Sequence, residues 1–124
     1  RGLGDVYKRQ GLASDTVEKI TLEDGGYLPV TEELFAEDAL IIENRQTQEV
    51  SLCDSEKVPY LTVKFDAPLF GVWSPVGKNA PFICIEPWYG RCDSVRFDGS
   101  FEEREWGSEL LPNTSFQTAY TVSV

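Results

Sequence analysis

The strongest constraint on the fold of this 124-residue chain is a series of short segments, most of which alternate apolar and polar residues. A period of two is typical of a β-strand with one buried face, and clusters of Gly, Pro, Asn and Asp separate the segments. Strands are predicted at 18–22, 39–42, 49–53, 60–65, 69–73, 81–86 and 115–124. At 31–35, Thr31 followed by two acids predicts a single helical turn. Because no long helix pattern is present, the sequence predicts an all-β chain, folded as an antiparallel sandwich or a barrel-like sheet.

Charge and hydropathy exclude several classes of partner. The formal net charge is -10, from 21 acidic and 11 basic residues, and would repel both nucleic acid and anionic membrane surfaces. No apolar run approaches the roughly 20 residues that a membrane-spanning helix needs. We therefore expect a single soluble domain, or part of one, with no nucleic-acid partner and no membrane partner. The pattern leaves the oligomeric state open.

Cysteine usage indicates a reducing compartment. Cys53, Cys84 and Cys92 are odd in number and lack the CxxC spacing of a zinc site, and the chain contains no histidine. We expect all three thiols to be reduced and structural, no bound metal, and a cytoplasmic protein. A bridge between Cys84 and Cys92 is the alternative.

The first ten residues stand apart from the rest. The chain begins with Arg1 rather than Met, and residues 1–10 are locally basic in an otherwise acidic sequence. They resemble the translated adaptor sequence that often begins open reading frames from metagenomic assemblies. We expect residues 1–10 to be non-native and residues 11–124 to form the domain. A genuine basic tail is the alternative.

The segment 82–90 carries the most chemistry. Alternation places Phe82, Cys84 and Glu86 on one face of a strand. Pro87 cannot donate a hydrogen bond, so pairing is predicted to stop there and leave Glu86 at a sheet edge. With Trp88 two residues further on, a carboxylate and an indole could hold the polar edge and the apolar face of a sugar. The alternative is a solvated glutamate beside a packed tryptophan.

Three blocks together resemble one known family. Residues 35–41, 71–74 and 84–90, with the acidic loop after Asp93 and the segment 110–116, are similar in order and spacing to the C-terminal part of the aldose 1-epimerase (galactose mutarotase) superfamily. The similarity is strongest to its LacX-like branch and covers roughly residues 11–124. It implies the C-terminal part of a galactose mutarotase-like supersandwich, which is a large antiparallel β-sandwich.

The resemblance also implies an activity. Members interconvert the α and β anomers of a hexose by acid/base ring opening, without cofactor or metal, and the substrate would be a monosaccharide of the galactose or glucose class. Glu86 matches the general base, and Asp38 matches a residue that hydrogen-bonds sugar hydroxyls. Trp73 and Trp88 would line the cleft, an expectation based on residue type and placement.

The chain departs from the family at one essential point. The family's catalytic histidine lies upstream of the matched region, and this chain has no histidine. We expect a truncated open reading frame, whose fragment is nearly inactive and prone to aggregation while the full-length protein is an epimerase. The alternatives are a carbohydrate-binding protein without catalysis, or a hexose-6-phosphate 1-epimerase that uses Arg91 and Arg96. Those two arginines are expected instead to balance local charge.

A group of acidic residues in the second half resembles a metal site only superficially. Its members are Asp93, Asp98, Glu102, Glu103 and Glu105. Their spacing is not that of a calcium loop, so a solvated acidic hairpin is favoured. Trp106, in the same region, is interpreted as a packing residue.

Overall fold

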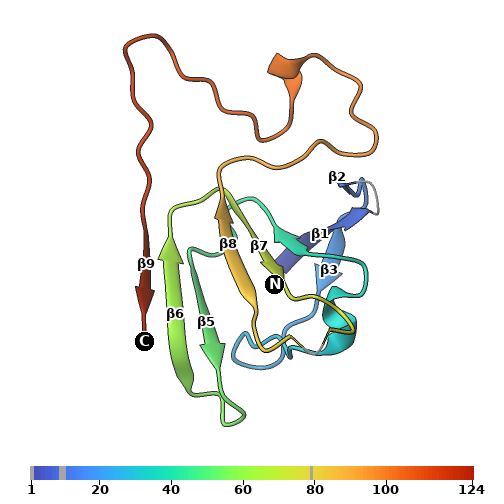
Figure 1. Cartoon of the computed structure of the whole chain (residues 1–124), viewed down its shortest axis with the longest axis vertical. Helices are drawn as coiled ribbons and strands as arrows, with labels where there is room; N and C mark the ends of the chain where they lie inside the picture. Colours follow the sequence, from blue (N-terminus) through green and yellow to red (C-terminus); the bar gives the residue numbers. More distant parts are fainter. Residues whose placement is uncertain (1, 9–10, 79) are drawn as a thin grey trace.

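The computed structural model describes residues 2–8, 11–78 and 80–124 (Figure 1). Its elements, in chain order, are β1 (Gly2–Lys8), β2 (Leu12–Ala13), β3 (Glu18–Ile20), the 3-10 helix η1 (Glu32–Phe35), β4 (Leu40–Ile42), β5 (Glu49–Cys53), β6 (Pro59–Phe65), β7 (Leu69–Trp73), β8 (Cys84–Trp88), the 3-10 helix η2 (Phe101–Glu103) and β9 (Tyr120–Ser123). In these described ranges, no helix is long and apolar enough to cross a membrane.

The strands form two antiparallel sheets. A six-stranded sheet has the order β2-β1-β4-β7-β8, with β3 also paired to β1, and a three-stranded sheet has the order β5-β6-β9. Every strand pair within these sheets is antiparallel. The all-β, antiparallel prediction is confirmed.

One apolar cluster lies between the two sheets, while the largest fully buried side chains of the described ranges, Ile41 and Leu69, lie on the other face of the larger sheet. Val63 and Phe65 of β6 are buried against Phe70 of β7, and the rings of Phe65 and Phe70 lie 5.1 Å apart at a tilt of 52°. Ala67, in the connection between these strands, is fully buried. Alternation in β6 leaves Lys64 exposed between two core residues, as the sequence pattern predicts.

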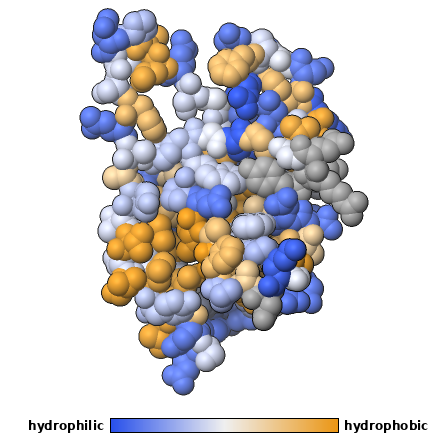
Figure 2. Space-filling view, viewed as in Figure 1, coloured by the Kyte–Doolittle hydropathy of each residue, from blue (hydrophilic) through white to orange (hydrophobic). Residues whose placement is uncertain are grey.

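The space between the sheets is only partly filled. A cavity of about 1300 Å³ is lined by core-facing side chains of both sheets, including Val50, Phe70, Val72 and Ile85. Figure 2 shows apolar surface over the region where Figure 1 places β6, β8 and β9. The described part of the chain therefore exposes a contiguous apolar surface.

Most predicted elements are present, but several begin or end at residues other than those predicted. At η1 the predicted helical turn forms, but the Thr31 side chain makes no capping hydrogen bond. The strand predicted at 81–86 begins three residues later, at Cys84, and continues to Trp88. The prediction that pairing stops at Pro87 is wrong, because Pro87 pairs with Phe70. Since β8 is an edge strand, every second N–H turns away from its single neighbour, and a proline at such a position costs no ladder hydrogen bond.

The last strand is shorter than predicted. Only Tyr120–Ser123 pairs with β6, where Tyr120 lies opposite Phe65. Because β6 ends at Phe65, residues 115–119 extend beyond the last partner that this strand offers. Figure 1 shows this segment extending away from the sheets before it turns into β9.

Part of the segment predicted to be non-native, residues 1–10, belongs to the larger sheet. Residues 2–8 form β1, which pairs with β2, β3 and β4, while residues 1, 9 and 10 lie outside the described part of the chain. Strand pairing uses main-chain groups that every residue except proline supplies in full, so it carries no information on the origin of these residues. Their non-native origin stays a prediction.

Candidate functional site

Three of the four predicted site residues share one face of the larger sheet. In the register of β7 and β8, Gly71 lies opposite Glu86, Trp73 opposite Cys84, and Leu69 opposite Trp88. The intervening residues Val72 and Ile85 pack into the core between the sheets. Because successive side chains alternate, Trp73, Glu86 and Trp88 lie on the opposite face, away from that core.

Glu86 stands in the middle of β8, where a side chain of its own strand donates a hydrogen bond to it. The indole Nε1–H of Trp88 donates to Oε2 at 3.1 Å, and Cys84 lies on the same face of β8. Burial, together with the negative charge of Glu86, raises the pKa of Cys84.

Trp73 extends this face along β7. Its ring lies 6.4 Å from that of Phe82 at a tilt of 56°, and the Ser74 hydroxyl donates to the Phe82 carbonyl at 2.9 Å. The ring is half-buried, so part of its surface stays open to solvent. It lies opposite Cys84, two positions along β8 from Glu86.

The register separates Asp38 from this group. The β4 residue level with Gly71 and Glu86 is Ile41, three residues beyond Asp38, and β7 lies between β4 and β8. Three residues of extended chain span about 10 Å. The structure thus places Asp38 at the entrance to β4 and does not bring it onto Glu86.

Asp38 nevertheless has an unusual backbone. Its φ is 119°, in a region that L-residues rarely adopt, and its Oδ1 accepts a hydrogen bond from the Ala39 N–H at 2.7 Å. The side chain is exposed. Backbone strain of this kind costs about 1–3 kcal/mol and clusters at functional sites, so this residue remains a candidate.

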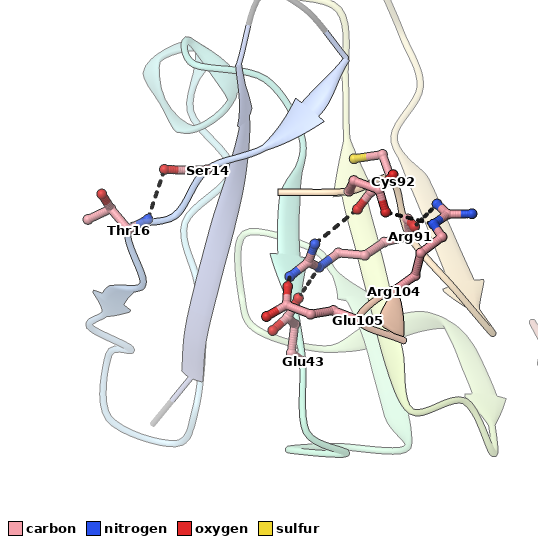
Figure 3. Close-up of polar contacts among 8 residues, drawn as sticks. Ser14, Thr16, Glu43, Arg91, Cys92, Arg104 and Glu105 are labelled. Atoms are coloured by element: carbon pink, nitrogen blue, oxygen red, sulfur yellow. Dashed lines mark hydrogen bonds and ion pairs between the residues drawn. The ribbon is translucent and has the colours of Figure 1, made fainter. Parts of the chain in front are cut away.

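A buried ion-pair cluster follows the end of β8. The Arg91 side chain is only 4% exposed; its Nε donates to Glu43 Oε1 at 2.5 Å, its Nη2 to Glu105 Oε2 at 2.7 Å, and its Nη1 to the Cys92 carbonyl at 2.9 Å. Figure 3 shows both carboxylates on one side of the guanidinium and the Cys92 carbonyl on the other. Burial alone would lower the pKa of Arg91, but Glu43 and Glu105 outweigh it and raise the pKa. Glu43 directly follows β4, so the cluster ties the loop after β8 to the sheet.

Two further arginines near this loop also form ion pairs. Arg104 Nε donates to Asp93 Oδ1 at 2.7 Å, and Arg96 forms an ion pair with Asp15. The expectation that Arg91 and Arg96 balance local charge is confirmed.

The predicted acidic hairpin is wrong, because the segment contains η2 instead. Ser100 and Glu103 form its capping box, and the backbone N–H of Ser100, with help from its side chain, lowers the pKa of Glu103. In the described ranges, no group of three or more His, Cys, Asp or Glu residues is arranged to hold a metal ion. The three cysteines are free.

Sequence reasoning missed two features of this region. Glu43 carried no signal, because a single glutamate after a short strand is common and its partner Arg91 lies 48 positions away. The position of Gly71 opposite Glu86 was equally invisible, because it depends on the register between β7 and β8. The position of Arg91 just beyond a predicted strand was the sequence feature that pointed toward this buried ion pair.

Comparison with curated proteins finds two relatives. The plasmid and chromosomal forms of protein LacX from Lactococcus lactis subsp. lactis are each 28% identical to this chain over 104 residues. The match covers 83% of this chain and 34% of each relative. The chain thus spans about a third of the length of the curated relatives it matches, which agrees with the expectation of a fragment. No protein-family model matches the chain.

Comparison with solved structures finds galactose mutarotase-like proteins. A galactose mutarotase related enzyme from Lactobacillus acidophilus aligns with a TM-score of 0.76 and 27% identity, over 99% of this chain and 41% of that one. A galactose mutarotase-like protein from Lactobacillus casei aligns with a TM-score of 0.70 and 21% identity, over 98% of this chain and 41% of that one. The fold is therefore that of the galactose mutarotase-like proteins.

Proposed function

This chain belongs to the aldose 1-epimerase (galactose mutarotase) superfamily, in its LacX-like branch, and we propose that the full-length protein to which it corresponds interconverts the α and β anomers of a hexose. The observation that carries this proposal is the position of Glu86. Its carboxylate lies on the sheet face opposite the apolar cluster between the sheets, and the Trp88 indole donates a hydrogen bond to it at 3.1 Å.

In the proposed reaction, Glu86 acts as general base and takes the proton from the C1 hydroxyl of the closed sugar. The C1–O5 bond breaks as a second group protonates the ring oxygen, and the aldehyde turns about the C1–C2 bond. Ring closure then reverses both proton transfers. A carboxylate suits such a role because it can accept a proton and return it within one cycle.

The second group lies outside this chain in the proposal, because the family pattern assigns it to a histidine and the 124 residues contain none. We therefore expect the chain alone to be nearly inactive. Asp38 is proposed to bind sugar hydroxyls, and its strained backbone supports a functional role. Trp73 and Trp88 are proposed to contact the sugar ring with their apolar surface.

The substrate proposal is an unphosphorylated aldose of the galactose or glucose class. A hexose 6-phosphate would need clustered cations around the phosphate. Arg91 is buried and donates from Nε, Nη1 and Nη2 to Glu43, Cys92 and Glu105, and Arg96 is paired with Asp15. These two arginines therefore give the phosphate alternative no support. The three free cysteines favour a cytoplasmic location.

Polarimetry on the full-length protein, obtained by extending the reading frame upstream, tests the proposal. Fresh α-D-galactose and α-D-glucose are followed with wild type, Glu86→Gln, and Glu109→Gln as an exposed control carboxylate. We expect wild type and the control to accelerate mutarotation. The acceleration by Glu86→Gln should be lower by about 100-fold or more. Saturable sugar binding at the spontaneous rate would favour a binding protein without catalysis.

A further inference from the structure

The contact between Trp88 and Glu86 requires the indole to fold back along its own strand. The two residues are two positions apart in β8, so their side chains leave the same face of the sheet about 7 Å from each other. The Nε1–Oε2 distance is nevertheless 3.1 Å. The indole therefore crosses the neighbouring strand surface toward Glu86 instead of standing upright.

Gly71 supplies the room for this orientation. It lies in β7 directly opposite Glu86, and its backbone sits beneath the six-membered ring of Trp88. A Cβ at this position would lie 2.7 Å from Cζ2 and 2.9 Å from Cη2 of the indole. Carbon atoms do not approach so closely, so any side chain at position 71 would displace the ring and with it the donor to Glu86.

We propose that Trp88 is a positioning residue for Glu86, seated on Gly71, and not only an apolar wall of the sugar site. The inference rests on the proposed function of Glu86. An indole N–H bonded to one carboxylate oxygen restricts rotation of the carboxyl group. A base held in its reactive orientation reacts faster than one that populates that orientation for only part of the time.

The contact is tested first on the full-length protein, in a measurement that does not depend on activity. In ¹H–¹⁵N spectra the Nε1–H cross-peaks of the tryptophans are assigned by Trp→Phe substitution. We expect Glu86→Gln and Gly71→Ala each to move the Trp88 cross-peak and to leave that of Trp106, in the loop beyond β8, unchanged. An identical Trp88 cross-peak in wild type and Glu86→Gln would overturn the proposal.

Kinetics on the full-length protein then distinguish two roles of Trp88, namely orienting Glu86 and contacting the sugar ring. Trp88→Phe keeps an aromatic ring and loses the N–H, so we expect kcat to fall about tenfold, as for loss of a hydrogen bond to a charged group, with KM within twofold. Trp106→Phe is the control and should change neither constant. A rise in KM with kcat unchanged in Trp88→Phe would assign only a wall role and overturn positioning.

A double-mutant cycle tests the role of Gly71. Gly71→Ala should lower kcat in the wild-type background and have no further effect on kcat in the Trp88→Ala background, because the ring it displaces is gone. Equal effects in both backgrounds would contradict a role through Trp88. If wild type shows no mutarotation, the proposed function fails, while the cross-peak comparison still decides whether the indole holds Glu86.

Discussion

Replacing Arg91 with alanine is expected to destabilise the fold by about 3–5 kcal/mol, the range measured when one partner of a buried ion pair is removed. Most of this cost comes from Glu43, whose side chain is 15% exposed and would keep its charge without a partner. The second partner, Glu105, is 58% exposed and can be rehydrated, so its share is about 0–1 kcal/mol.

Two comparisons isolate this mechanism. Arg96→Ala removes an ion pair whose arginine is 83% exposed, and should cost about 1 kcal/mol or less. Combining Arg91→Met with Glu43→Leu removes both buried charges and leaves apolar groups of similar volume. The double variant should recover most of the loss, because no uncompensated charge remains in the interior.

The assay is urea unfolding followed by tryptophan fluorescence, with the free energy of unfolding taken by linear extrapolation. Since a domain of this size has about 5–15 kcal/mol of stability, the Arg91→Ala loss is a large fraction of the total. Arg91→Lys, which keeps a charge and loses the planar fork, should fall between wild type and Arg91→Ala. Equal losses for Arg91→Ala and Arg96→Ala would refute the reasoning.

Four further predictions follow from other contacts. Because Glu86 helps to raise the pKa of Cys84, Glu86→Gln should leave more thiolate at pH 8 and speed alkylation of Cys84 by iodoacetamide, measured by mass spectrometry; an unchanged rate would argue against the contact. Phe70→Ala, in the core between the sheets, should cost about 3–5 kcal/mol in urea unfolding, and a loss below about 1 kcal/mol would mean that the core is misplaced. Asp38→Gly should be about 1 kcal/mol more stable than Asp38→Ala, because only glycine adopts a φ of 119° without strain; the reverse order would show that this conformation is not adopted. The open space between the sheets should bind an apolar dye such as ANS at neutral pH, and absence of fluorescence enhancement would indicate that this surface is covered.

Much of the fold was predictable because its signal is local. The alternation of Leu61, Val63 and Phe65 against Thr62 and Lys64 specifies both a strand and its buried face, and the structure has that strand as β6. The ends were less predictable, since they depend on partners. Pro87 continues β8 only because that strand is at the edge of its sheet, and edge position is a property of the assembled topology.

The candidate site divides in the same way. Glu86 and Trp88 could be placed on one face from a spacing of two residues, but the direction of the indole depends on Gly71, in the neighbouring strand. Similarly, the pairing of Glu43 with Arg91 joins two strand ends 48 positions apart. Alternation predicts which face a side chain leaves from, whereas contacts across strands require the register.

The most direct test of the account is whether a sugar binds on the face that carries Trp73, Glu86 and Trp88. D-galactose or D-glucose is titrated into the ¹⁵N-labelled full-length protein while the indole Nε1–H cross-peaks are followed. The account predicts saturable shifts of the Trp73 and Trp88 cross-peaks, with the Trp106 cross-peak unmoved. Shifts confined to Trp106 would place the sugar site elsewhere and contradict the account. The absence of a shift in any indole, at a sugar concentration that saturates the mutarotation rate, would contradict it as well.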